Sequence, residues 1–298
     1  MKRVIALGFF DGVHLGHGAL LRRTRELADR LGCPAAALTL DTHPDNLLRG
    51  TPTRLLNTPV ERRELMQTLY GIDEVLALHF DAATMRQPWQ EFVERTLIGA
   101  YSAVHLVCGA DYRCGSGGAG TAELLQAFCA ARGVGCDVIP QLSMDGAVVS
   151  SSRIRGLIAS GEMAEAVRLL GHPHLLSGIV VTGHQLGRTI GIPTANLDVS
   201  PQILLPMDGV YAAETEVDGR RYPAVTNIGM RPTVHGDCRT VEPWLLDFSG
   251  DLYGRRLTLR LLAFLRGERR FPSLEALQAE IRRNAEQTRA LLSDAKRS

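Results

Sequence analysis

Lysine is almost absent from this chain. Lys2 and Lys296 are the only two, and every other basic residue among the 33 is an arginine. No interior lysine is therefore available for a Schiff base, a Walker-type phosphate loop or the ATP-binding strand of a protein kinase. If this protein handles ATP, then arginine, histidine, backbone N–H groups and Mg²⁺ must hold the phosphates.

Other absences narrow the class of protein. The 298 residues carry a formal net charge of only +1, which argues against a large basic surface for nucleic acid. No apolar run reaches the roughly 18 residues of a membrane span, and the chain passes from Met1 directly into a strand-like pattern without a signal peptide. We therefore expect a cytoplasmic protein, and nothing in the sequence indicates an obligate protein partner.

The six cysteines include no Cys-x-x-Cys pair, so a zinc ribbon or a redox motif is not expected. We expect buried free thiols instead. The length is sufficient for two domains of ordinary size.

The most informative segment is residues 8–17, which read Gly-Phe-Phe-Asp-Gly-Val-His-Leu-Gly-His. A short β-prone run, residues 3–7, precedes it and a helical pattern follows, so His14 and His17 flank a predicted helix N-terminus. Free N–H groups and the helix dipole favour an anion there, and Gly16 lets a phosphate approach the backbone. Such a site suits nucleotidyl transfer from ATP. Two histidines on a solvated turn, or a metal-binding pair, would give the same spacing.

Strand-like and helical patterns alternate up to about residue 155. This alternation predicts a Rossmann-like α/β domain with a parallel sheet covered by helices. Ligands bind beyond the carboxyl ends of strands in such sheets, where we expect His14, His17, Asp111 and residues 41–46 to gather. The strand candidates are residues 3–7, 34–41, 74–80 and 103–109, and the helix candidates are residues 60–70, 88–98 and 121–132.

The pattern changes after a helical stretch at residues 151–170. Strand candidates separated by turns follow, including a hairpin at Asp218-Gly219, and residues 273–292 have the periodicity of one long helix. A small β-barrel with a C-terminal helix explains this half most simply. The predicted domains are residues 1–170 and 171–298. The strand candidates are residues 210–217, 220–226, 240–248 and 256–265.

Residues 115–120, Gly-Ser-Gly-Gly-Ala-Gly, match the Gly-x-Gly-x-x-Gly pattern of dinucleotide-binding turns. The context differs from that of a dinucleotide-binding turn. Residues 111–114 separate the first glycine from the preceding strand, and Asp137, the candidate ribose-binding acid, falls at the start rather than the end of the next strand run. We expect a glycine-rich loop, either mobile over a ligand site or simply flexible.

Residues 150–155, Ser-Ser-Ser-Arg-Ile-Arg, place hydroxyl groups and two arginines at a predicted helix start. Helix capping with solvated arginines would explain this pattern. A phosphate clamp formed by Arg153 and Arg155 would explain it too, because nucleotidyl transfer depends on positioning and charge stabilisation.

In the second half, Thr194 and Asn196 follow a glycine-containing segment. In an extended chain both side chains point the same way, and their oxygen atoms could share a Mg²⁺ ion with phosphates. Glu242 is flanked by apolar residues. It is either a catalytic carboxylate or a rim carboxylate paired with one of the many arginines.

Taken in order, these segments resemble the bifunctional bacterial riboflavin kinase/FAD synthetase family over essentially the whole chain. The similarity implies phosphorylation of riboflavin to FMN by ATP, then adenylylation of FMN to FAD. Mg²⁺ is the implied cofactor, and riboflavin, FMN and ATP are the implied partners. The segments that carry the resemblance are residues 8–17, 43–44, 107–115, 150–155, 193–196, 227–233, 242–248 and 251–254.

The resemblance also implies a role for each candidate site residue. The first domain would be the FMN adenylyltransferase and the second the riboflavin kinase. The implied catalytic residues are His14, His17 and Glu242, and Glu242 would be the base for the ribityl 5′-hydroxyl. The implied flavin-binding residues are Asn46 and Asp111, and the implied Mg²⁺ ligands are Thr194 and Asn196. The implied ATP- or phosphate-binding residues are Gly8, Phe9, Phe10, Asp11, Gly16, Ser151, Ser152, Arg153, Arg155, Gly187, Arg188 and Thr189.

Several positions depart from the residues that are frequent in the family. Phe9 occupies a position where Asn is frequent, and Leu40-Asp41-Thr42 occupies the place of Phe-Asp-Pro. Cys114 replaces a frequent Phe, and Trp244 replaces a frequent His. Two other functions are compatible with the pattern: an adenylyltransferase for another phosphorylated acceptor, and a flavin-binding regulator that has lost catalysis. Retention of His14, His17, Thr194, Asn196 and Glu242 argues against the regulator.

Overall fold

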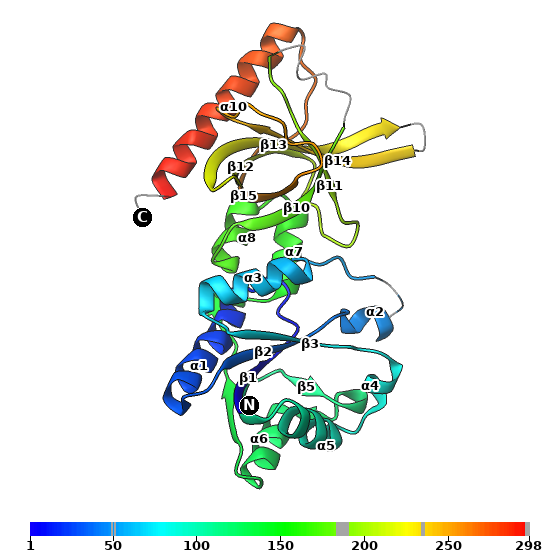
Figure 1. The fold of residues 1–298 in the computed structure, drawn as a ribbon. Helices are drawn as coiled ribbons and strands as arrows, with labels where there is room; N and C mark the ends of the chain where they lie inside the picture. Colours follow the sequence, from blue (N-terminus) through cyan, green and yellow to red (C-terminus); the bar gives the residue numbers. More distant parts are fainter. Residues whose placement is uncertain (49, 51, 183–190, 234–235, 296–298) are drawn as a thin grey trace. The chain divides into compact units, whose positions relative to one another are not determined.

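The computed structural model describes residues 1–48, 50, 52–182, 191–233 and 236–295. It divides the chain into two compact units, Met1–Ser151 and Ser152–Ser298 (Figure 1). Among the described residues, no helix combines the length and the apolar character needed to cross a membrane.

The first unit is built on a five-stranded parallel sheet in the order β3-β2-β1-β4-β7, which confirms the predicted α/β class. The chain runs outward from β1 to β2 and β3 and then returns to the other side of β1, so the direction of winding switches between β1 and β4. Ligands of open α/β sheets bind at such a switch point. The strands are β1 (Arg3–Leu7), β2 (Ala35–Leu40), β3 (Glu74–Leu78), β4 (Ala103–Gly109) and β7 (Gly135–Ile139).

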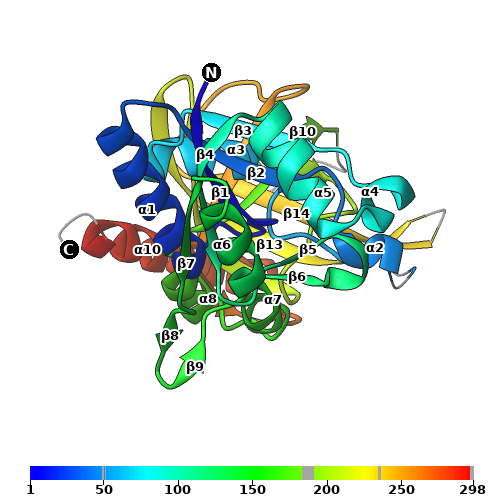
Figure 2. The ribbon, with the colours of Figure 1, turned by 90° about the horizontal axis from the view of Figure 1, so that it is seen from below.

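Helices lie on both faces of this sheet, with α1 and α5 on opposite sides in both views (Figures 1 and 2). The helix expected at residues 88–98 is a short α-helix that continues as a π-helix, η1. The helices are α1 (Leu15–Leu31), α2 (Pro44–Leu48), α3 (Pro59–Tyr70), α4 (Ala82–Arg86), α5 (Trp89–Glu91), η1 (Phe92–Ala100) and α6 (Ala122–Ala130).

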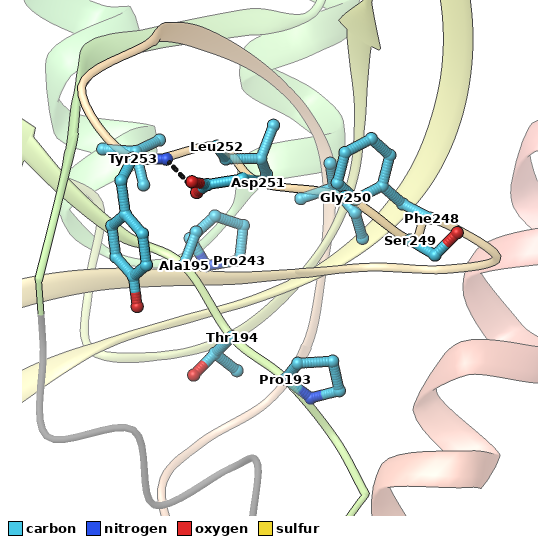
Figure 3. Close-up of a pocket in the computed structure, with 12 residues that line it drawn as sticks. Pro193, Thr194, Ala195, Pro243, Phe248, Ser249, Gly250, Asp251, Leu252 and Tyr253 are labelled. Atoms are coloured by element: carbon cyan, nitrogen blue, oxygen red, sulfur yellow. Dashed lines mark hydrogen bonds between the residues drawn. The ribbon is translucent and has the colours of Figure 1, made fainter.

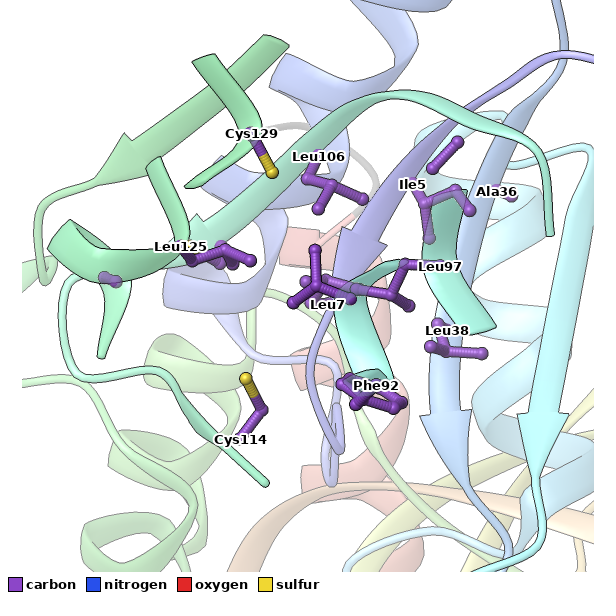
Figure 4. Packing of buried hydrophobic residues seen from close by; sticks show 14 residues of the cluster. Ile5, Leu7, Ala36, Leu38, Phe92, Leu97, Leu106, Cys114, Leu125 and Cys129 are labelled. Atoms are coloured by element: carbon purple, nitrogen blue, oxygen red, sulfur yellow. The ribbon is translucent and has the colours of Figure 1, made fainter. Parts of the chain in front are cut away.

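The side chains of β1 point alternately to the two faces of the sheet, and both faces are covered by helices. Ile5 and Leu7 are buried with Leu106 of β4, Leu97 of η1 and Leu125 of α6 (Figure 4). Successive side chains of a strand point to opposite faces, and α1 packs against β1, β2 and β4. Cysteine side chains contribute to the same core. The free thiols, as predicted, include those of Cys33, Cys108, Cys114, Cys129 and Cys136, of which Cys108, Cys114 and Cys129 are buried.

The glycine-rich segment is a hydrogen-bonded ribbon of β5 (Arg113–Cys114) and β6 (Gly120–Thr121). A Cβ atom at Gly115 would lie 2.5 Å from Trp89, and one at Gly120 would lie 2.7 Å from it. The close approach of the ribbon to the backbone and the Cβ atom of Trp89 therefore explains these two glycines. Asp137 is bonded to Arg23 at 2.6 Å and to His105 at 3.0 Å, so its carboxylate holds helix α1 and strand β4.

The second unit is built on a six-stranded antiparallel sheet in the order β11-β10-β15-β12-β13-β14. The N–H group of Ala195 donates to the carbonyl of Pro243 at 2.9 Å, which brings the β11 edge to the β14 edge and nearly closes a barrel. The predicted barrel is therefore confirmed. The strands are β10 (His174–Val181), β11 (Asn196–Val199), β12 (Gly209–Val217), β13 (Arg220–Thr233), β14 (Gly236–Leu245) and β15 (Arg256–Arg266).

The predicted turns and helices of this half are also present. Asp218 and Gly219 have φ angles of 52° and 76°, which form the tight turn of the β12–β13 hairpin. The C-terminal helix is α10 (Leu274–Ala295), and its Ala285 belongs to a buried cluster against which Trp244 of β14 packs. The helical stretch before the barrel consists of α7 (Ser151–Ala159) and α8 (Met163–Leu170).

Candidate functional site

The turn that links β1 to α1 has an unusual backbone. Phe10 has a φ angle of 58°, Gly12 of 83° and Val13 of 42°. A positive φ is a genuine outlier for a β-branched residue such as Val13. Strained residues of this kind persist only where the surrounding structure determines their conformation, and they concentrate at functional sites. This turn follows β1, beside the switch point of the sheet.

His14 and His17 meet at the start of α1. The Nδ1 atom of His14 accepts a hydrogen bond from the backbone N–H group of His17 at 3.3 Å, so the ring presents an N–H group at Nε2. The two rings stack with their centroids 3.6 Å apart. A Cβ atom at Gly16 would lie 3.1 Å from the His14 ring. Glycine at this position therefore leaves room for the stacked pair.

The surroundings of His17 disfavour its charged form. Burial of the ring, the neighbouring His14 and the Arg62 guanidinium lower the pKa of His17 well below its usual range. Among the described residues, the Nδ1 atom of His17 is buried and has no hydrogen-bond partner. At neutral pH the His17 ring is therefore neutral, and its N–H group can donate a hydrogen bond to an anion.

The Asp11 carboxylate faces the protein interior. It is 1% exposed and accepts the N–H group of Leu56 at 2.9 Å and that of Asn57 at 3.4 Å. The backbone carbonyl of Asp11 accepts the Ser151 hydroxyl at 2.9 Å. The Asp11 carboxylate and the Ser151 hydroxyl therefore both support the turn.

The predicted flavin residues lie at the same sheet edge. Asn46, in α2 after β2, accepts the N–H group of Thr53 at 2.8 Å. Asp111 follows β4, is exposed and accepts a hydrogen bond from the Gln141 amide at 3.1 Å. The His43 ring contacts the Phe9 ring edge-on at a centroid distance of 4.8 Å. The expected gathering at the carboxyl ends of the strands is thus present.

Asp41 and His79 join the ends of β2 and β3 at this edge. Asp41 Oδ2 lies 2.6 Å from His79 Nδ1, and Asp41 Oδ1 accepts the N–H group of Phe80 at 3.0 Å. The hydrogen bond to Asp41 raises the pKa of His79. This pair fixes the turn that leads to His43.

The serine–arginine segment opens helix α7. Ser151 is the last residue of the first unit, whereas Ser152, Arg153 and Arg155 belong to the second unit. The Arg153 guanidinium lies 3.7 Å from the Glu165 carboxylate.

The second unit contains a pocket of about 220 Å³ (Figure 3). Its loop wall is held in place because the N–H group of Tyr253 donates to Asp251 at 2.9 Å and that of Gly254 donates to the Val180 carbonyl at 2.9 Å. The lining residues are Val180, Pro193, Thr194, Ala195, Pro243, Leu245, Phe248, Ser249, Gly250, Asp251, Leu252 and Tyr253.

The predicted Mg²⁺ ligands and the predicted base lie on neighbouring segments. The Ala195–Pro243 hydrogen bond joins the backbone between Thr194 and Asn196 to the residue that follows Glu242. Glu242 is half-buried, faces Asn227 across the β13–β14 pair and accepts the Thr240 hydroxyl at 2.8 Å. Gly187, Arg188 and Thr189, predicted to bind ATP, lie outside the described residues.

Sequence reasoning missed Arg62 and Thr39. Both are buried and both bond to the turn, Arg62 through its guanidinium and Thr39 through its hydroxyl. Periodicity offered a clue for Arg62, because Glu61 and Arg62 occupy the same helix face as the buried Leu65 and Met66. A charged residue on an apolar face indicates a buried polar partner.

Comparisons with known proteins agree with these observations. Residues 1–153 match the family model described as FAD synthetase, and residues 170–292 match the one described as riboflavin kinase. The bifunctional riboflavin kinase/FMN adenylyltransferase of Pseudomonas fluorescens is 38% identical over 291 residues, which cover 97% of this chain and 92% of the relative. That of Bacillus subtilis (strain 168) is 32% identical over 290 residues, covering 96% and 91%.

A solved structure has the same fold. A crystal structure described as a macrolide-efflux protein from Streptococcus pneumoniae matches with a TM-score of 0.87 and 32% sequence identity. The match covers 97% of this chain and 94% of that one.

Proposed function

Because this chain belongs to the bifunctional riboflavin kinase/FMN adenylyltransferase family, we propose that its two units divide two successive reactions between them. The protein phosphorylates riboflavin to FMN with ATP and adenylylates FMN to FAD. We assign the second reaction to the first unit and the first reaction to the second unit. The domain boundary at residue 170 that the sequence suggests stays a prediction; helix α8 falls in the second unit.

In the adenylyltransferase domain, the β1–α1 turn is the proposed ATP site. A phosphate oxygen of FMN attacks the α-phosphorus of ATP, the bond to the bridging oxygen breaks, and pyrophosphate leaves. His14 and His17 donate to the phosphates at the N-terminus of α1, where the helix dipole also favours negative charge. The backbone of residues 8–11 and Gly16 complete the cradle, and Asp11 supports it through its buried carboxylate.

On sequence grounds alone, Ser152, Arg153 and Arg155 remain the proposed charge clamp on the triphosphate. The leaving pyrophosphate needs fixed cations, and the interior of this chain contains no lysine to supply them. Asn46 and Asp111 are proposed to bind FMN, because they follow the strands on either side of the turn.

In the kinase domain, the pocket beside Thr194 is the proposed nucleotide site. Phe248 and Tyr253 provide aromatic surface in its wall. Glu242 takes the proton from the ribityl 5′-hydroxyl as that oxygen attacks the γ-phosphorus and ADP leaves. Gly187, Arg188 and Thr189 remain proposed ATP-binding residues on sequence grounds.

The oxygen-bearing side chains of Thr194 and Asn196 fit Mg²⁺. This ion prefers oxygen ligands and is usually held by one or two protein groups together with water and substrate phosphates. The bound ion would neutralise phosphate charge during transfer. The side chains of Thr194 and Asn196 would orient it, since the Ala195 N–H group fixes their backbone against β14.

The Ala195–Pro243 hydrogen bond carries the kinase assignment, because it brings candidate phosphate ligands beside the candidate base. Chromatography of riboflavin incubated with the protein, ATP and Mg²⁺ tests the whole proposal, and we expect FMN to appear first and FAD to follow. Flavin binding without conversion would support a regulator. No flavin binding would support an adenylyltransferase for another acceptor. A cytoplasmic location and independence from protein partners stay predictions.

A further inference from the structure

A buried guanidinium lies directly beneath the β1–α1 turn. Arg62 is 2% exposed, and its Nη1 atom donates to the Phe9 carbonyl at 2.8 Å and to the Thr39 hydroxyl at 3.0 Å. The Thr39 hydroxyl in turn donates to the same Phe9 carbonyl at 2.8 Å. One carbonyl next to the first strained residue of the turn is thus held from both α3 and β2.

Hydrogen bonds link the turn and the start of α3 through both backbone and side-chain groups. Asp11 of the turn accepts N–H groups from the segment before α3, and Arg62 of α3 donates to the carbonyl of the turn. Arg62 Nη2 also lies 4.0 Å from Asp11 Oδ1, with both side chains almost fully buried. Removing one partner of a buried charge pair is costly, because the other charge stays buried.

Arg62 is itself placed rigidly. It lies in the first turn of α3, where the Thr58 hydroxyl accepts the Glu61 N–H group and the Glu61 carboxylate accepts the Thr58 N–H group. This reciprocal capping fixes the helix start. The guanidinium also lies 4.1 Å from the centre of the Phe9 ring, so it contacts the turn through a side chain as well as through the backbone.

We propose that Arg62 is a positioning residue for adenylyl transfer: it fixes the Phe9 carbonyl and thereby the strained backbone that presents His14 and His17 to ATP. The inference rests on the proposed ATP site. Arg62 touches no substrate in this role. It sets the shape of the turn, and misplacement of a phosphate ligand by about 1 Å can cost on the order of 10²-fold in rate.

Arg62→Met keeps the packing of the aliphatic stem and removes the charge and the donors. We expect kcat/KM for ATP in FAD synthesis to fall by about tenfold or more, with a raised KM for ATP and an unchanged KM for FMN. Arg62→Lys should recover only part of the loss, because an ammonium group does not reproduce the planar fork. Thr39→Val, a smaller change to the same carbonyl, should raise the KM for ATP less.

Arg3→Met is the matched control. Arg3 lies at the opposite end of β1 and is similarly anchored, to Glu74 at 3.0 Å and to the Tyr101 carbonyl at 3.1 Å. Partial unfolding would lower the active fraction and kcat in either variant, but would leave both KM values unchanged. Riboflavin phosphorylation by the same polypeptide provides the second control.

A parental KM for ATP in folded Arg62→Met, or equal effects of Arg62→Met and Arg3→Met, would overturn the positioning role. If Arg62→Met fails to fold, Thr39→Val decides the question through the same KM. His17→Ala distinguishes a failure of the positioning role from a misassigned ATP site. If His17→Ala slows FAD synthesis but the Arg62 and Thr39 variants do not, only the positioning role fails. If His17→Ala is also without effect, the ATP site is misassigned.

Discussion

The two candidate sites are held by different parts of their domains. The β1–α1 turn has positive φ angles at Phe10 and Val13 and is fixed from below by the buried Asp11 and Arg62. The kinase pocket is instead assembled from a barrel edge and a loop, with Thr194 and Glu242 on neighbouring backbone segments. Backbone shape dominates the first site, and side-chain chemistry dominates the second.

This difference follows from the chemistry of the two acceptor substrates, FMN and riboflavin. FMN brings an already ionised phosphate oxygen, so adenylyl transfer needs positioned donors and does not need a base. Riboflavin brings a primary hydroxyl, which loses its proton readily only with help from a base. The lowered pKa of His17 suits a neutral donor, and the half-buried Glu242 suits proton removal.

The largest expected effect breaks the kinase reaction alone. Glu242→Gln removes the base while keeping the shape, so riboflavin phosphorylation should slow by about 10²- to 10⁴-fold and conversion of FMN to FAD should be unchanged. Each reaction is assayed separately at saturating Mg²⁺-ATP. Glu216→Gln, on the exposed end of β12, is the control. A Glu242→Gln protein that phosphorylates riboflavin normally would refute the base assignment.

The converse variant affects the other domain. His17→Ala removes one donor to the ATP phosphates, so FAD synthesis from FMN should slow by about 10²- to 10³-fold. Phosphorylation of riboflavin by the same protein should stay at the parental rate. Equal losses of both reactions would contradict two separate sites, and circular dichroism excludes unfolding as the cause.

The sequence predicted the parts of the molecule that depend on local pattern. Strands β1 to β4, the Asp218-Gly219 hairpin and the terminal helix all follow from periodicity and turn chemistry. The Thr39–Arg62–Phe9 network could not be predicted, because its members are brought together by the sheet and by the packing of α3. The same holds for Cys114, which lies in the core of the first unit, and for Trp244, which packs beneath α10.

A smaller effect tests whether helix α8 belongs to the kinase domain. Helix α8 packs on β10 and β15 and buries Met163, Leu169 and Leu170. We expect residues 152–298 to fold alone and make FMN, and residues 172–298 to lose at least about 2 kcal/mol of stability, since the α8 contacts are gone. Denaturant unfolding of both fragments measures the difference. Equal stabilities would show that the kinase domain begins after α8.

The smallest expected effect separates the two domains by their response to acid. His174 at the start of β10 is 1% exposed, and burial together with the neighbouring His172 lowers its pKa from 6.5 to about 4. As the pH falls below about 6.5, the unfolded chain takes up the proton first, so the folded kinase domain loses stability until the pH reaches about 4.

The loss should reach about 2 kcal/mol at about pH 5, and His174→Leu should abolish that part of it. The chain has two tryptophans, so a Trp89→Phe background leaves Trp244 to report unfolding of the kinase domain by fluorescence. The reverse background, Trp244→Phe, leaves Trp89 to report the adenylyltransferase domain, whose acid response should not change with His174→Leu. If both backgrounds lose stability in parallel and His174→Leu alters neither, the acid response does not originate in the buried His174.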